Sequence, residues 1–83
     1  MRGTIYQINE NRGMVGVFTE DGDFSIFELL SGDTVETGDE VQWQNDTGLG
    51  DEHLTNITHA ESFDVYFQNH HVSKDQLRQQ LLY

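Results

Sequence analysis

Residues 2–27 read RGTIYQIN, ENRG, MVGVFT, EDGD and FSIF, and this stretch decides the fold. Three short runs rich in Ile, Val, Phe and Tyr are separated by two polar turns, each of which contains a glycine. Strand-forming residues bounded by turn-forming residues at this spacing predict a three-stranded antiparallel meander. Gly13 supplies the positive φ angle that a tight turn needs, and Asp21-Gly22 is a strong hairpin signal. We therefore expect the rest of the chain to close and cap this meander.

Alternation of side chains assigns two faces to the meander. In the second run, Val15 and Val17 share the face that suits a core, and Met14 and Phe18 share the other. Met14 and Phe18 then point outward, unless the sheet is covered on both sides. In the third run, the same reasoning places Phe27 on the outer surface beside Phe18.

Two more runs extend the sheet. Residues 41–44 alternate, with Val41 and Trp43 expected inward, and residues 54–58 form a fifth strand. Five short strands with turn signals this frequent are typical of a small antiparallel barrel or sandwich.

Size and charge limit the function. The chain has 83 residues and no cysteine, so it has room for one small core and no disulfide to brace it. Fifteen acidic and four basic residues give a formal net charge of −11. Such a surface keeps a small protein soluble, repels polyanions or attracts a basic partner. Neither a signal peptide nor a membrane-length apolar run is present, so we expect a cytoplasmic protein without membrane contact.

The order of the motifs resembles the bacterial cold-shock domain family. The shared single positions are Gly3, Asn9, Arg12, Gly13, Val15, Val17, Asp21 and Gly22. Residues 37–43 resemble the family's E-G-Q-x-V-x-F motif, and residues 54–58 resemble its A-x-N-V-T close. The resemblance covers about residues 1–59. It implies a five-stranded antiparallel OB-type barrel that binds single-stranded RNA or DNA on its exposed sheet face.

Most of the family's base-stacking residues are replaced in this chain. Met14 and Gly16 stand where the basic-G-F-G-F motif has two phenylalanines, and Glu28 stands where the third strand has an aromatic residue. The candidate nucleic-acid-binding residues that the resemblance leaves are Tyr6, Asn9, Arg12, Met14, Phe18 and Phe27. Each stacked base contributes about 1–3 kcal/mol, and phosphate neutralisation needs Lys or Arg. We therefore expect weak or absent binding, or packing of Tyr6, Phe18 and Phe27 under the C-terminal extension.

Residues 60–83 lie beyond the resemblance and form a C-terminal extension. Its residues 62–68 alternate like a strand. Ser73 followed by Gln76 is the pattern of a capping box, which predicts a helix over about residues 74–82.

So short a helix is marginal alone and must dock on something. Leu77 and Leu81 lie one turn apart on one face, and Leu82 follows them. The helix either covers the exposed face of the barrel, which would block nucleic acid, or docks against a partner. These three leucines are therefore candidate protein-interaction residues.

Enzymatic and metal chemistry have little support in the sequence. The four histidines show no ligand spacing, and residues 20–23 are a hairpin turn rather than a calcium loop. No nucleophile stands at a recognisable spacing from a base, and no Gly-rich phosphate loop precedes a helix. We expect a non-enzymatic binding module without metal or cofactor, whose inherited ligand is single-stranded nucleic acid. The alternative is a protein-interaction or regulatory module that has lost this ligand and meets a basic or apolar partner surface.

Overall fold

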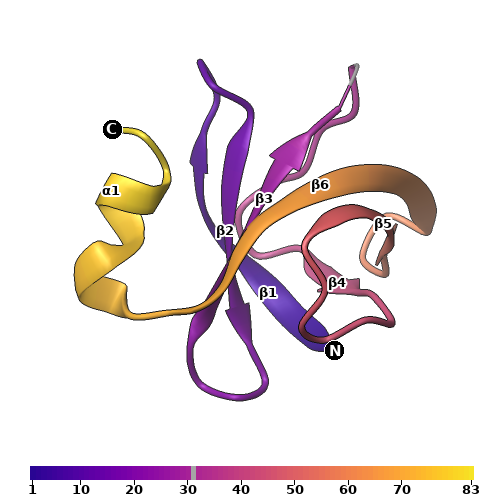
Figure 1. The fold of residues 1–83 in the computed structure, drawn as a ribbon. Coiled ribbons are helices and arrows are strands. Elements are labelled where there is room, and N and C mark those ends of the chain that lie inside the picture. The colour runs from indigo at the N-terminus through magenta and orange to yellow at the C-terminus, as the bar shows by residue number, and fades with distance from the viewer. Residues whose placement is uncertain (31) are drawn as a thin grey trace.

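The computed structural model describes residues 1–30 and 32–83. Within these residues, antiparallel strands form a small barrel with a short helical segment beside it (Figure 1). The strands are β1 (Arg2–Asn9), β2 (Met14–Thr19), β3 (Phe24–Leu29), β4 (Glu40–Gln42), β5 (Gly50–Asn56) and β6 (Glu61–Val72). A 3₁₀ helix, η1 (Lys74–Gln76), leads into α1 (Leu77–Gln80). The predicted β1–β2–β3 meander is confirmed, and Gly13 and Gly22 have the positive φ angles that its turns require.

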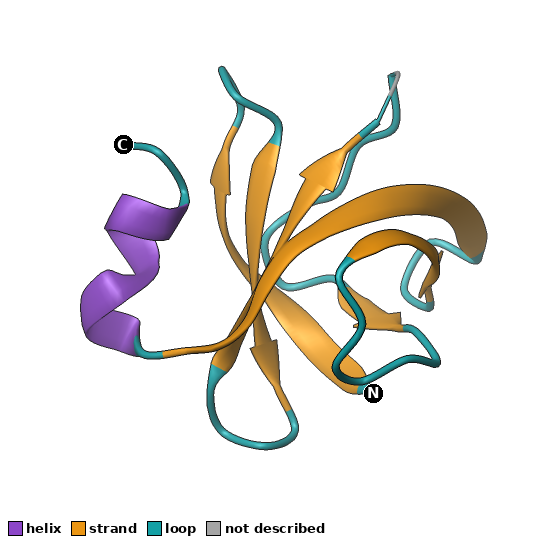
Figure 2. Ribbon diagram, viewed as in Figure 1, coloured by secondary structure: helices purple, strands orange, loops and turns teal. Residues whose placement is uncertain are grey.

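The barrel closes in the order β1-β2-β3-β6-β5-β4. Figure 2 shows the strands in orange and the short helical segment in purple beside them. The expected count of five strands is wrong, because six strands form the closed barrel in the described chain. β6 is 12 residues long and pairs antiparallel with β5 through its first part and with β3 through its second part. It therefore satisfies backbone groups of both strands that would otherwise form open sheet edges.

One hydrophobic cluster fills the barrel. Val15, Val17, Val41 and Trp43 point inward, as predicted, together with residues of β5 and β6. Phe27 also lies here and is fully buried, with its ring 5.6 Å from that of Phe67. The expectation that Phe27 faces outward is therefore wrong. Its cross-strand partner is the inward-facing Val15, and directly paired residues share a face of the sheet.

A second cluster lies outside the barrel, between its outer face and residues 73–83, which we call the C-terminal segment. Figure 1 shows this segment beside the barrel. This outer cluster consists of Met14, Phe24, Ile26, Val72, Leu77 and Leu81. Of the two expected destinations for the helix, the structure shows the first, since the segment covers part of the outer face. The helical part is shorter than expected, and Ser73 precedes it without a side-chain capping hydrogen bond.

Candidate binding surface on the outer face

An aromatic pocket lies where the outer face meets the start of the C-terminal segment. Phe18 and Phe24 are paired across β2 and β3, and their ring centroids are 5.2 Å apart. Tyr6 meets Phe24 edge-on at 5.0 Å. Tyr6 and Phe18 are 42% and 44% exposed, whereas Phe24 is buried. The pocket encloses about 490 Å³ and is lined by Tyr6, Phe18, Gly22, Asp23, Phe24, Ser73 and Lys74. Two ring surfaces are therefore available to a ligand above a buried third ring.

Lys74 brings a positive charge to the aromatic pocket. Its Nζ lies 5.9 Å from the centre of the Tyr6 ring, within the range of a cation–π contact. Because Lys74 belongs to η1, this charge reaches the barrel only through the docked C-terminal segment. The pocket is thus built from the barrel and the segment together.

A carboxylate–imidazole pair borders the same pocket. The His71 Nδ1 lies 2.9 Å from the Asp23 Oδ2, and the Thr19 hydroxyl lies 3.1 Å from the Asp23 Oδ1. The hydrogen bond from His71 lowers the pKa of Asp23, although partial burial opposes the shift. The same hydrogen bond raises the pKa of His71. The acidic group at the pocket is therefore ionised and already partnered.

The C-terminal segment covers the neighbouring part of this face. Leu77 and Leu81 are buried and pack in the outer cluster with Met14 and Ile26. Gly16 lies directly beneath Leu77, since a Cβ at Gly16 would lie 2.8 Å from the Leu77 Cδ1. The missing side chain at this position lets Leu77 approach the sheet closely.

Two hydrogen bonds tie the end of the segment to β1. The Asn9 Nδ2 donates to the buried carbonyl oxygen of Leu81 at 2.8 Å. The Tyr83 hydroxyl donates to the Ile8 carbonyl oxygen at 2.7 Å. The Arg78 guanidinium lies 5.0 Å from the centre of the Tyr83 ring. These contacts fix the segment at the end of the face away from the aromatic pocket.

The structure separates the residues predicted to bind nucleic acid. Tyr6 and Phe18 lie in the aromatic pocket with exposed rings. Asn9 and Met14 are buried where the C-terminal segment contacts the barrel. Phe27 is inside the barrel and cannot touch a ligand on the surface. The predicted residues thus do not form one continuous binding surface.

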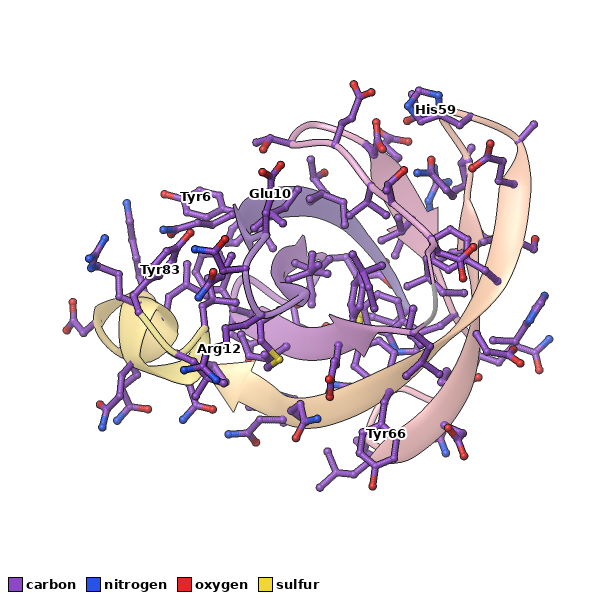
Figure 3. The ribbon with its side chains drawn as sticks, turned by 90° about the horizontal axis from the view of Figure 1, so that it is seen from above. Tyr6, Glu10, Arg12, His59, Tyr66 and Tyr83 are labelled. Carbon is purple, nitrogen blue, oxygen red and sulfur yellow. The ribbon has the colours of Figure 1, made fainter. Side chains whose placement is uncertain are left out.

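Arg12 and Leu82 lie at the far end of the covered face. Arg12 is exposed in the turn after β1, and it lines a separate depression together with Leu82. Figure 3 shows Arg12 apart from Tyr6. Among the predicted protein-interaction residues, Leu77 and Leu81 are buried against the barrel, and Leu82 is 54% exposed. Only Leu82 of these three leucines is accessible to another molecule.

Phe24 and Lys74 belong to the pocket although the sequence did not single them out. A signal for Phe24 was present in the hairpin around Asp21-Gly22. A four-residue turn between Thr19 and Phe24 pairs Phe18 with Phe24, and this register puts both rings on one face. Lys74 had no such signal, because its place depends on where the C-terminal segment docks.

Ser25 and His70 form a contact that resembles a nucleophile and its base. The Ser25 Oγ lies 2.8 Å from the His70 Nδ1, and the His70 Nε2 lies 2.8 Å from the Gly48 carbonyl oxygen. Since a carbonyl can only accept, Nε2 carries the proton and Nδ1 accepts from the serine hydroxyl. Ser25 is buried, so a substrate cannot reach it. This contact joins β3 to β6 and to the loop before β5.

A buried carboxylate organises the turn before β4. The Asp39 Oδ2 accepts hydrogen bonds of 2.9 Å from the Asn56 side chain and from the Glu36 backbone N–H. The His59 Nε2 lies 3.1 Å from the Asp39 Oδ1. Burial raises the pKa of Asp39, but these hydrogen bonds and the charge of His59 outweigh it and lower the pKa overall. Glu36, Asp39 and His59 could offer ligand atoms to a cation within 4.8 Å of one another, a grouping that their sequence spacing did not reveal. The hydrogen bonds of Asp39 account for the placement of His59 and of the Glu36 backbone.

Comparisons with protein-family models, with curated proteins and with solved structures gave no match for this chain. Among the described residues, no helix is long and apolar enough to cross a membrane.

Proposed function

We propose that the protein is a small, non-enzymatic module that binds single-stranded nucleic acid weakly through the aromatic pocket. The proposal rests on the exposed rings of Tyr6 and Phe18, which both contact Phe24, and on the Lys74 ammonium beside them. Such rings offer stacking surfaces to bases, and an ammonium offers a counter-charge to a phosphate. The resemblance to cold-shock domains supports the same face of the barrel as the binding surface.

The size of these contributions indicates weak binding. Stacking contributes about 1–3 kcal/mol per base, so two exposed rings supply about 2–6 kcal/mol before the strand is ordered. Because a dissociation constant of 1 mM corresponds to about 4 kcal/mol, we expect a value on the order of 0.1–1 mM. One ammonium predicts a slope of about −0.7 in log K against log salt for a single strand. The net charge of −11 acts against tighter binding.

Burial also favours a module that binds without catalysis. Within the described chain, the Ser25–His70 contact has the geometry of a nucleophile and its base. Ser25 is buried, so a substrate cannot reach this pair. The aromatic pocket is lined by three aromatic rings and by turn residues, and its one carboxylate, Asp23, is hydrogen-bonded to His71. Its chemistry suits stacking and charge neutralisation.

An NMR titration with oligothymidine at low salt tests the proposal. Chemical-shift changes should centre on Tyr6, Phe18 and Phe24 and weaken as salt is added. Tyr6→Ala should remove most of the binding. Tyr66→Ala is the matched control, because Tyr66 is 43% exposed on β6 and lies across the molecule from Tyr6 (Figure 3). Silence at low salt, or equal losses in the two variants, would refute binding at this pocket.

Protein recognition is the second candidate, and the charge of the molecule favours it. The formal net charge is −11, and Asp23 lines the pocket together with Lys74. A partner segment with one aromatic side chain for the pocket and basic residues on both sides would fit such a surface. A titration with a lysine-rich peptide that contains one tryptophan separates the two candidates. Shifts at Phe18 with this peptide and none with oligothymidine would favour protein recognition.

A further inference from the structure

The C-terminal segment occupies part of the same face that we assign to the ligand. From this overlap, and on the basis of the proposed function, we infer that the segment is a displaceable cover that competes with single-stranded nucleic acid. Displacing it extends the aromatic pocket across Met14 and Ile26 and strengthens binding.

The two hydrophobic clusters make such a displacement compatible with an intact barrel. The barrel interior and the outer cluster share no residue. Leu77 and Leu81 contribute only to the outer cluster, and the six strands close without the segment. The segment can therefore leave while every strand keeps its neighbours and the interior cluster stays dry.

The segment is held by few contacts for its length. Its helical parts span three and four residues, well below the roughly 12 residues at which an isolated helix becomes marginal. Neither helical part has a side-chain capping hydrogen bond. Two buried leucines and the hydrogen bonds from Asn9 and Tyr83 provide the main attachment. Elements held by so few contacts are among the least stable parts of a fold, and they open locally.

The surface beneath the segment continues the aromatic pocket. Phe24 contacts Tyr6 and Phe18 on one side and belongs to the outer cluster on the other. Met14 and Ile26 extend this apolar surface along β2 and β3. Opening also withdraws Lys74 from Tyr6, so the gain in apolar contact is set against the loss of one ammonium. The inference requires the apolar gain along β2 and β3 to exceed the loss of this ammonium, and the affinity of the opened variants measures that balance.

A disulfide that locks the segment tests this inference. A Cβ at Gly16 would lie 3.7 Å from the Leu77 Cγ, the position that the sulfur of a cysteine at residue 77 would take, so the two introduced side chains face each other. The Gly16→Cys/Leu77→Cys variant therefore holds the segment closed when oxidised and releases it when reduced. The chain has no cysteine of its own, so no competing disulfide forms and the native protein controls for the reductant. Leu81→Ala is a second opened variant, and it leaves Gly16 unchanged on the ligand-binding face.

The readout is the affinity for oligothymidine, measured by NMR in both redox states. With a minor open state of about 1–10% in the native protein, release of the segment in the reduced variant should tighten binding by up to about 10–100-fold relative to the native protein. The oxidised variant should bind more weakly than the native protein. Leu81→Ala should likewise bind tighter than the native protein, with shifts that extend to the Met14 methyl group. If the oxidised form binds as tightly as the reduced form, or more tightly, the segment is not a displaceable cover. The proposed function is unaffected by that outcome. Silence of the native protein and of every variant would overturn the proposed function, and the cover with it.

Discussion

The contact between Gly16 and Leu77 determines how closely the C-terminal segment seats, and a substitution can perturb it directly. In Gly16→Ala, the new Cβ would lie 2.8 Å from the buried Leu77 Cδ1, which is closer than van der Waals contact allows. Overpacking of this kind costs about 1–3 kcal/mol. The φ angle of Gly16 is not positive, so alanine suits the backbone and offsets about 0.4–1 kcal/mol through the unfolded chain. We expect a net loss of about 1–2 kcal/mol in the free energy of unfolding.

The same change should have a different effect once Leu77 is shortened. Leu77→Ala alone should cost about 1–3 kcal/mol, because it leaves a cavity against the sheet and the loss cannot exceed the free energy that docks the segment, given an open state of about 1–10%. In this background the added methyl group of Gly16→Ala enters free space, so its effect should be neutral or stabilising. The double-mutant cycle should therefore show a coupling of about 1–3 kcal/mol between the two positions.

Urea unfolding followed by Trp43 fluorescence measures this coupling. Trp43 is buried in the barrel and lies outside the outer cluster, so its signal reports on the barrel rather than on the substituted contact. Leu82→Ala serves as the control, because Leu82 belongs to the same segment and is exposed. A Gly16→Ala effect that is equal in both backgrounds, within about 0.5 kcal/mol, would refute the seating of Leu77 on Gly16.

Three other predictions follow from single contacts. Phe27→Ala should lower the unfolding free energy by about 3–5 kcal/mol in urea melts, whereas Phe18→Ala should cost about 1 kcal/mol or less and abolish the oligothymidine shifts. Equal stability losses would contradict the placement of Phe27 inside the barrel. Asn9→Ala should cost about 1–3 kcal/mol by leaving a buried carbonyl unpaired, and it should speed amide exchange at the end of the C-terminal segment first. An NMR titration of the His71 imidazole should give a midpoint above 6.5 that falls back in Asp23→Asn. Because the pKa of His71 is raised, its contribution to stability is complete below pH 6.5 and disappears as the pH rises through the midpoint. Because the pKa of Asp23 is lowered, its contribution disappears as the pH falls through that lowered pKa.

Local sequence signals identified the strands, but they did not show which strands pair with one another. The meander of residues 2–27 could be read from its turns, because a hairpin pairs segments that are adjacent in the chain. The alternation of residues 62–68 likewise indicated a strand. It could not show that this strand lies between β3 and β5, because alternation records which face is buried and not which strand is paired. The strand count was therefore wrong although the strand itself was recognised.

Alternation also fails where a strand is buried on both faces. Phe24, Ile26 and Phe27 of β3 are all buried, the first two beneath the C-terminal segment and the third inside the barrel. A strand covered on both sides reads as a continuous apolar run, so its pattern does not identify the inner face. Only the hairpin register could have assigned Phe27 to the interior.

The small and flexible residues of β2 and the C-terminal segment form one structural feature. Met14 belongs to the outer cluster, and Gly16 lies directly beneath Leu77. A phenylalanine at position 16 would occupy the space of Leu77, so the segment docks here on a residue without a side chain. Conversely, without the segment the face would expose Met14 and Ile26 to water. The sequence contained both parts of this arrangement, but only their contact in space shows that each makes the other possible.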